Sequence, residues 1–161
     1  MLVEMKVRGL ALDPVSNMPI IVLRDSAGDT VLPIWVGIFE ANAIAMQMEK
    51  IVSPRPMTHD LLCSAIGALG GRVERIVITD LRENTFYATI HVDRAGERLE
   101  IDSRPSDAMA IALRVDAPIF VDDVVLERSR AGRESADPDA SEKLRRWLEE
   151  VNPEDLGKYP M

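Results

Sequence analysis

The fold is decided by two similar stretches, Glu40-Ala-Asn-Ala-Ile-Ala-Met-Gln-Met48 and Asp107-Ala-Met-Ala-Ile-Ala-Leu-Arg-Val115, which lie 67 residues apart. Each stretch has the apolar spacing of a helix that buries one face. A second pair, the turns Asp25-Ser-Ala-Gly-Asp29 and Asp93-Arg-Ala-Gly-Glu97, recurs 68 residues apart. Because turn and helix recur in the same order, the sequence predicts an internal duplication.

In the residues before each of the two similar helices, the alternation of apolar and polar residues predicts three strands. The predicted strands cover residues 2–12, 19–24, 30–36, 72–81, 85–93 and 97–102, and the predicted helices cover 37–51, 58–69 and 105–115. Gly70-Gly71 would end the second helix. We therefore expect an α+β fold of duplicated β-β-β-α units, with helices packed on antiparallel or mixed sheets.

The remainder of the chain differs in composition. Residues 119–126 suggest a last extended segment, and the polar residues 128–140 suggest a linker. Residues 141–151 carry an apolar stripe at helical spacing, which predicts a C-terminal amphipathic helix that docks on its own domain or forms an oligomer contact. The predicted division is a domain at 1–128 followed by a linker and helical tail at 129–161.

The composition indicates a cytoplasmic, one-domain protein. The chain has 161 residues, 47% of them hydrophobic, and a single cysteine, Cys63. One cysteine forms no internal disulfide, which argues against an oxidising compartment. No apolar run approaches the roughly 20 residues needed to span a bilayer. The first residues alternate and carry charges, unlike a signal peptide.

The net charge of −8 argues against a large surface that binds nucleic acid by charge alone. It leaves room for a metal-assisted site or a small cationic cluster. The sequence lacks the GxGxxG, P-loop, GxSxG, HExxH and CxxC motifs. With two histidines in the chain, a histidine-rich zinc site is not expected.

Glu40 and Asp107 occupy matching positions at the starts of the two similar helices. An acid in a first helical turn interacts favourably with the helix dipole, and this alone could explain both residues. Each acid also heads an otherwise apolar helix face. A partly buried carboxylate needs a cation, a metal ion or backbone donors as its partner, so both residues are candidates for a site.

His59 and Asp60 begin the second predicted helix, with Thr58 as the expected N-cap. The helix dipole disfavours a charged imidazole there. A neutral His59 could accept a proton or bind a metal, or it could simply bond to nearby backbone. Cys63 is expected to be a small core side chain, and His91 a solvated strand residue.

The segment Ser103-Arg-Pro-Ser-Asp107 forms a third cluster. Ser103 or Ser106 could cap the helix that follows, and capping could be the only role of the cluster. Alternatively Arg104, the serine hydroxyls and the open backbone N–H groups could bind a phosphate. Arg55, in the stiff Pro54-Arg55-Pro56 connector, could supply a second cation.

Three blocks match a known family: Pro33-Ile-Trp-Val-Gly-Ile-Phe-Glu40-Ala41, Arg55-Pro-Met-Thr-His59-Asp60-Leu-Leu62 and Ser103-Arg-Pro-Ser-Asp107-Ala-Met-Ala-Ile111. Residues 1–128 thereby resemble the bifunctional nuclease domain family. The resemblance implies an α+β fold that associates into oligomers and cleaves RNA and DNA. It also carries over six candidate site residues: Glu40, His59, Asp60, Arg104, Ser106 and Asp107.

The leading hypothesis is a nuclease that hydrolyses phosphodiester bonds with the help of a metal. Glu40, Asp60 and Asp107 would hold Mg²⁺ or Mn²⁺, which prefer oxygen ligands. The metal would activate water and stabilise the phosphate, and His59 would act as general acid or base. Arginines 55 and 104, with serines 103 and 106, would bind the phosphate.

Two alternatives stay open. The same residues could form a phosphate or small-ligand pocket in a non-catalytic regulatory module that oligomerises. The chain could also be a scaffold that assembles through Trp35, Phe39 and the helix that contains Trp147.

Overall fold

A computed structural model describes residues 1–135 and 146–150. The elements are, in order, β1 (Leu2–Leu12), β2 (Pro19–Asp25), β3 (Val31–Trp35), α1 (Ile38–Met48), α2 (Thr58–Ala68), β4 (Gly71–Arg82), β5 (Thr85–Arg94), β6 (Glu97–Ser103), α3 (Pro105–Val115), β7 (Ile119–Asp122) and α4 (Asp123–Ser135). This order confirms the predicted α+β class. No helix within the described residues is long and apolar enough to cross a membrane.

The described strands form one seven-stranded sheet in the order β3-β2-β1-β7-β4-β5-β6. Each set of three strands is an antiparallel meander. The short β7 lies between the two meanders, antiparallel to β1 and parallel to β4. The two halves are thus arranged alike on either side of β7, while their duplication stays a prediction.

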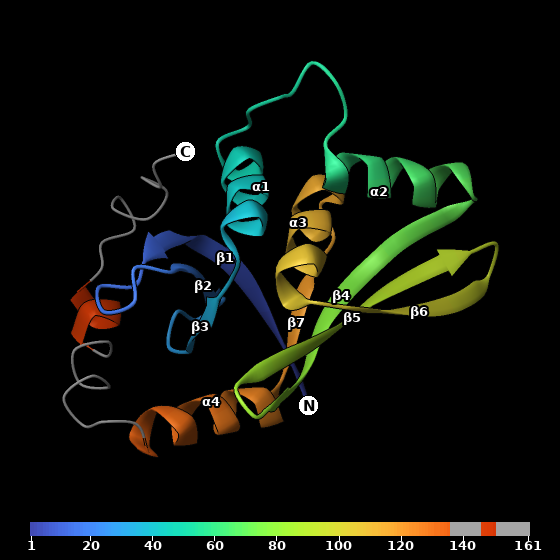
Figure 1. Ribbon diagram of the computed structural model, residues 1–161. Coiled ribbons are helices and arrows are strands. Elements are labelled where there is room, and N and C mark those ends of the chain that lie inside the picture. The colour runs from blue at the N-terminus through green and yellow to red at the C-terminus, as the bar shows by residue number, and fades with distance from the viewer. Residues whose placement is uncertain (136–145, 151–161) are drawn as a thin grey trace.

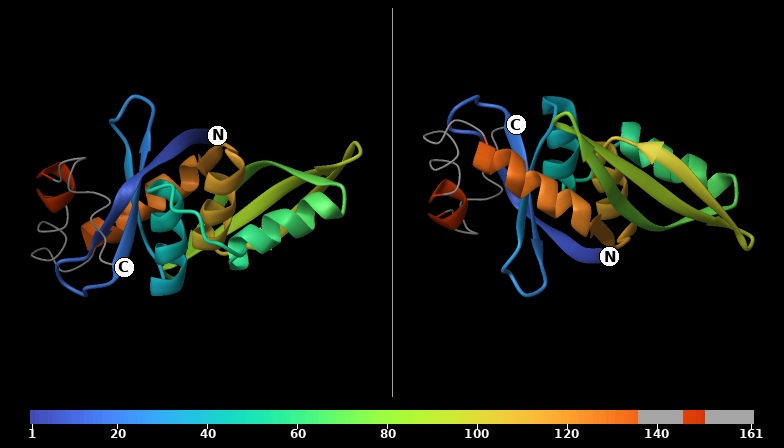
Figure 2. Two further views of the ribbon diagram at one scale, coloured as in Figure 1. Left: turned by 90° about the horizontal axis from the view of Figure 1, so that it is seen from above. Right: turned by 90° about the horizontal axis from the view of Figure 1, so that it is seen from below.

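The helices cover both faces of the sheet. Figure 2 shows α1 and α3 side by side on one side of the strands and α4 on the other. Several small alanines are buried on different sides of α1 and α3, where the two helices contact each other and the buried isoleucines and valines of the sheet. In Figure 1, α2 projects away from α1 along β4.

The predicted extended segment at 119–126 is wrong in its second half. The strand β7 ends at Asp122, and α4 begins at Asp123. Val125, Leu126 and Ser129 are buried at helical spacing, so one face of this segment packs against the sheet. The predicted linker is therefore helical as far as residue 135, across the predicted boundary at residue 128. Residues 136–140 lie outside the described part.

Most of the predicted C-terminal helix at 141–151 also lies outside the described part. Residues 146–150 are helical. Leu148 is buried against Ile20 and Val22, on the face of β2 opposite the main core, and Trp147 packs on the same cluster. This short segment therefore covers part of the outer sheet face within its own chain.

Asp13 fixes the end of β3 to the β1–β2 turn. Its Oδ2 accepts a hydrogen bond of 2.6 Å from the Trp35 indole, and its Oδ1 accepts one of 2.8 Å from the backbone of Val15. Burial alone raises the pKa of a carboxyl group, but these hydrogen bonds outweigh it and hold the pKa of Asp13 below its ordinary value.

We expect Asp13→Asn to destabilise the fold by about 1–3 kcal/mol at pH 7, because one amide oxygen replaces two acceptors. The lowered pKa means that Asp13 stabilises the folded state above pH ~4 and loses this contribution as the pH falls through the folded-state pKa. The difference between variant and wild type should therefore shrink in acid. Urea unfolding at pH 7 and in acid measures this difference in the free energy of unfolding. Asp29→Asn, at an exposed position, is the control.

Candidate active site

The start of α2 meets α3 through a histidine–carboxylate pair. Nε2 of His59 lies 2.9 Å from Oδ1 of Asp107. The His59 side chain is 9% exposed and the Asp107 side chain 36% exposed. The two residues are 48 positions apart in the sequence, so the packing of α2 on α3 brings them together.

The geometry orients the imidazole of His59. An ionised Asp107 only accepts hydrogen bonds, so Nε2 carries the proton. Nδ1 makes no hydrogen bond to any residue in the described part of the chain. No buried side-chain nitrogen or oxygen there lacks a partner, so Nδ1 must reach the surface. A ring held at one nitrogen and open at the other is suited to accept a proton from a bound molecule.

Arg114 holds α2 in this position. Its Nε donates to Oδ1 of Asp60 at 2.7 Å, its Nη1 to the carbonyl of Ala110 at 2.9 Å, and its Nη2 to the carbonyl of Ala43 at 3.2 Å. Its side chain is only 8% exposed. One guanidinium therefore contacts α1, α2 and α3 and satisfies the charge that its burial would otherwise leave unpaired.

Asp60 stabilises the start of α2. Its Oδ2 accepts the backbone N–H of Met57 at 3.0 Å. That bond and the Arg114 guanidinium hold the pKa of Asp60 below its ordinary value. Met57 is the N-cap, so the prediction of Thr58 was wrong by one residue. The carboxylate at the third helical position fixes the preceding backbone N–H, as in one half of a capping box.

Glu40 lies in the first turn of α1, half-buried, and folds back over Gly37. A side chain at Gly37 would overlap its carboxylate, so the glycine makes room for this conformation. Glu40 forms no ion pair with the residues that the structure describes. It is not part of the His59–Asp107 pair.

The three predicted metal ligands do not form one site. Within residues 1–135 and 146–150, no three His, Cys, Asp or Glu side chains are placed to hold a metal ion together. Asp60 is bound to Arg114 and Met57, and Asp107 to His59. The three carboxylates therefore do not fit one common metal centre, and a bound Mg²⁺ or Mn²⁺ ion remains a prediction.

Three of the four predicted phosphate ligands lie around the start of α3. Arg104 is the exposed N-cap, and neither Ser103 nor Ser106 caps the helix. Ser103 donates to the carbonyl of Arg104 at 2.8 Å, and Ser106 is buried. Arg55 is exposed in the connector before α2. Neither arginine forms an ion pair with a described residue, so both guanidinium groups can receive an anion.

The role of Arg114 was not predicted from the sequence. It lies on the same helix face as Asp107, about 10 Å further along the axis, and the two do not pair. Its partner, Asp60, is 54 positions earlier. A basic residue at the end of an apolar helix face was the available signal, but no spacing rule identifies a partner on another helix.

Cys63 and His91 take no part in this pair. Burial raises the pKa of the Cys63 thiol, so the thiol stays protonated at neutral pH and is a poor nucleophile. It is half-buried rather than part of the closed core. His91 lies on β5 with its Nδ1 3.7 Å from Oε1 of Glu100.

Comparisons with known proteins agree on one family description. A family model described as the bifunctional nuclease domain matches residues 21–134. An uncharacterized protein of Mycobacterium tuberculosis is 39% identical over 162 residues, which cover 95% of this chain and 97% of that protein. Bifunctional nuclease 1 of Oryza sativa subsp. japonica is 26% identical over 112 residues, or 68% of this chain and 34% of the rice protein. Bifunctional nuclease 2 of Arabidopsis thaliana is 25% identical over 105 residues, or 63% and 32%. The chain thus matches about a third of each plant protein.

Arg114→Met should destabilise the fold by about 3 kcal/mol, the low end for removal of one partner of a buried ion pair, because Asp60 is 39% exposed. Arg94→Met, which removes the exposed pair with Glu97, is the matched control and should cost less than about 1 kcal/mol. Urea unfolding of both variants measures the difference. Equal losses would show that Arg114 does not anchor the helices.

Proposed function

The chain belongs to the bifunctional nuclease domain family, as the three sequence blocks indicated, and from this premise we propose that it hydrolyses phosphodiester bonds in RNA, DNA or both. The observation that carries the proposal is the pair formed by His59 and Asp107. It combines an oriented, largely buried imidazole with a partly exposed carboxylate, and leaves the second ring nitrogen without a hydrogen-bond partner among the described residues.

In the proposed reaction, Nδ1 of His59 takes a proton from the attacking water. The resulting imidazolium is stabilised by Asp107, which also keeps the ring in one orientation. The water oxygen forms a bond to phosphorus, and the bond from phosphorus to the leaving oxygen breaks. The proton on Nδ1 then passes to that oxygen, which returns the histidine to its starting state.

Arg104 and the start of α3 support the phosphate-binding part of the proposal. The first backbone N–H groups of a helix have no partner within the helix and attract anions. Arg104 stands directly before these groups and is exposed. Asp107 is three residues further on, so a phosphate bound here would lie close to the His59–Asp107 pair. Arg55, four residues before His59, would add charge from the connector.

His59→Ala should lower cleavage of single-stranded RNA and DNA by about 10²- to 10⁴-fold, the usual contribution of general acid–base catalysis. Asp107→Asn should lower cleavage by a similar factor, because the neutral asparagine amide stabilises an imidazolium poorly. His91→Ala is the matched control, since it removes the other histidine and should leave cleavage unchanged. Melting temperatures establish that each variant is folded.

Unchanged cleavage by both His59→Ala and Asp107→Asn would contradict the proposal. The same assay with EDTA and with Glu40→Ala tests the proposed Mg²⁺ or Mn²⁺. The regulatory alternative is favoured by the net charge of −8. It would replace the nuclease proposal if wild-type protein bound phosphate but cleaved no substrate with either metal present.

We also propose that the chain forms a homo-oligomer, which its exposed apolar surface supports. Phe39 is 84% exposed at the start of α1, and other large apolar side chains are exposed in the connector and along α2: Val52, Leu61 and Leu69. We take these exposed apolar side chains as candidate contact points between chains. The other residues of the scaffold hypothesis, Trp35 and Trp147, pack on the β2 cluster within the chain.

A double substitution, Phe39→Glu with Leu61→Glu, should lower the molar mass in solution to that of one chain, 17.9 kDa. Buried charges without partners would make the contact unfavourable. Light scattering after size-exclusion chromatography measures the mass. Val15→Glu changes an equally apolar, exposed residue in the β1–β2 turn and should leave the mass unchanged. A wild-type protein of one-chain mass would contradict the oligomer.

A further inference from the structure

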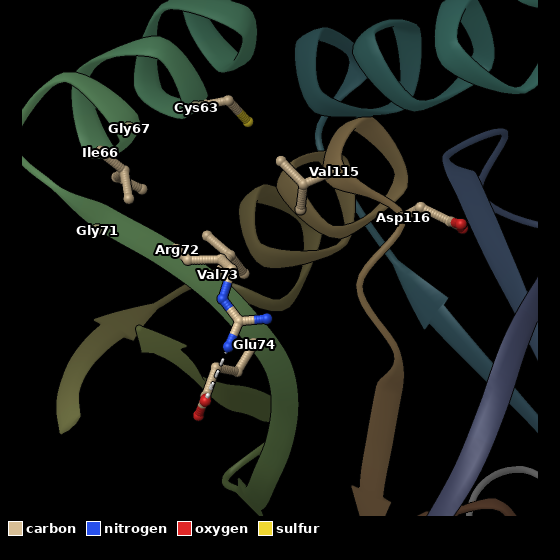
Figure 3. A pocket seen from close by; sticks show the side chains of 9 residues that line it. All are labelled: Cys63, Ile66, Gly67, Gly71, Arg72, Val73, Glu74, Val115 and Asp116. Carbon is tan, nitrogen blue, oxygen red and sulfur yellow. Dashed lines mark ion pairs between the residues drawn. The ribbon is translucent and has the colours of Figure 1, made fainter. Parts of the chain in front are cut away.

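A pocket of about 570 Å³ opens between α2, the first residues of β4 and the end of α3. Figure 3 shows its walls. The apolar part of the lining comes from Cys63, Ile66, Val73 and Val115. The remaining side chains are charged and of both signs: Arg72, Glu74 and Asp116. The volume lies within the range of small-molecule sites in proteins.

The pocket is on the same face of α2 as His59. His59, Cys63 and Ile66 follow one another at spacings of four and three residues, which places them in one row along the helix. Cys63 is one turn from His59, about 6 Å along the axis. A molecule bound at His59 could therefore extend directly along α2 into the pocket.

Gly67 keeps the pocket open. Glycine inside a helix costs about 1 kcal/mol relative to alanine, and here no close packing explains it. Apart from its own helix backbone, no atom lies within 4 Å of the position of a Cβ at Gly67. Gly71 is the opposite case, because a Cβ there would meet Ile66 and Val92 at 2.9 Å. Gly67 is exposed and lines the pocket, so a side chain at residue 67 would extend into open space at the pocket rim.

The strand edge beside the pocket is open as well. Among the described residues, β7 pairs with β4 only at Ile76, Val77 and Ile78. The earlier residues of β4, which line the pocket, have no strand on that side. Backbone N–H and C=O groups of such an edge are available to a ligand with planar donor and acceptor groups.

We propose that this pocket binds a nucleobase of the substrate, next to the phosphate at His59. The inference rests on the proposed function. The apolar side chains would cover the two faces of the base. The β4 edge would bond to its polar rim, and the Arg72–Glu74 ion pair, 3.6 Å long, would lie beside it. A base bound in this way requires a single-stranded or unpaired substrate, because paired bases in a duplex do not expose their faces.

Cys63 gives a direct test, since it lines the pocket and is the single cysteine of the chain. In full-length His59→Ala, which preserves the substrate, the rate of Cys63 modification by methyl methanethiosulfonate is measured with oligothymidylate and with an abasic oligomer of equal phosphate number. At about ten times Kd, a base in the pocket should slow modification about tenfold. The abasic oligomer should leave the rate unchanged.

Gly67→Leu supplies the second measurement, with Gly132→Leu on α4 as its matched control, because a Cβ at either glycine meets open space. Both variants should melt no lower than wild type. Gly67→Leu should weaken oligothymidylate binding about tenfold, because a contact to the base is lost, and leave binding of the abasic oligomer unchanged. Gly132→Leu should change neither.

Three outcomes separate the inference from the nuclease proposal. Binding of both oligomers with equal effects on Cys63 would overturn the base pocket and leave the phosphate site intact. Unweakened oligothymidylate binding by folded Gly67→Leu would overturn it too. If neither oligomer binds to wild-type or His59→Ala protein, the nucleic-acid substrate itself is wrong, and the base pocket falls with it.

Discussion

The guanidinium group of Arg114 is the contact on which the candidate site depends. It bonds to Ala43 on α1, to Asp60 on α2 and to Ala110 within its own helix. A charge buried to this degree is tolerable only when its hydrogen-bonding groups are satisfied. One side chain therefore ties the three helices together, in addition to the apolar packing of α1 and α3. Because Asp60 follows His59 directly, fixing Asp60 also fixes the imidazole in front of Asp107.

The contacts of the two similar helices, α1 and α3, are alike at one pair of matching positions and differ at another. Arg114 bonds from α3 to a carbonyl of α1, and at the matching position of α1, Gln47 lies 3.5 Å from the carbonyl of Leu113 on α3. The packing is thus nearly reciprocal. At the other pair of matching positions, Asp107 has His59 as its partner, whereas Glu40 folds over Gly37. Among the described residues, only the second of these two matching acids pairs with an imidazole.

The position of α2 also links the pair to the neighbouring pocket. The helix contacts α3 near its start and β4 further along, and its length projects from the body of the fold in Figure 1. One row of its residues therefore faces first Asp107 and then the pocket. A substrate that follows this row would meet the candidate catalytic pair and then an apolar wall, which suits an extended single strand better than a compact duplex.

Local sequence patterns were enough to predict the elements, the fold class and the family. Alternation and helical spacing are local patterns, and they placed the strands of both meanders and helices α1 to α3 within a few residues. They failed after Asp122, where a short apolar run reads equally well as strand or helix until its packing is known. Sequence also selected His59 and Asp107 as candidates, each from its place in a first helical turn. The pairings of His59 with Asp107 and of Asp60 with Arg114 depend on the tertiary structure. So do the separate position of Glu40 and the pocket beside Gly67. These pairings join residues about 50 positions apart, and the packing of whole helices, which no local spacing encodes, decides them.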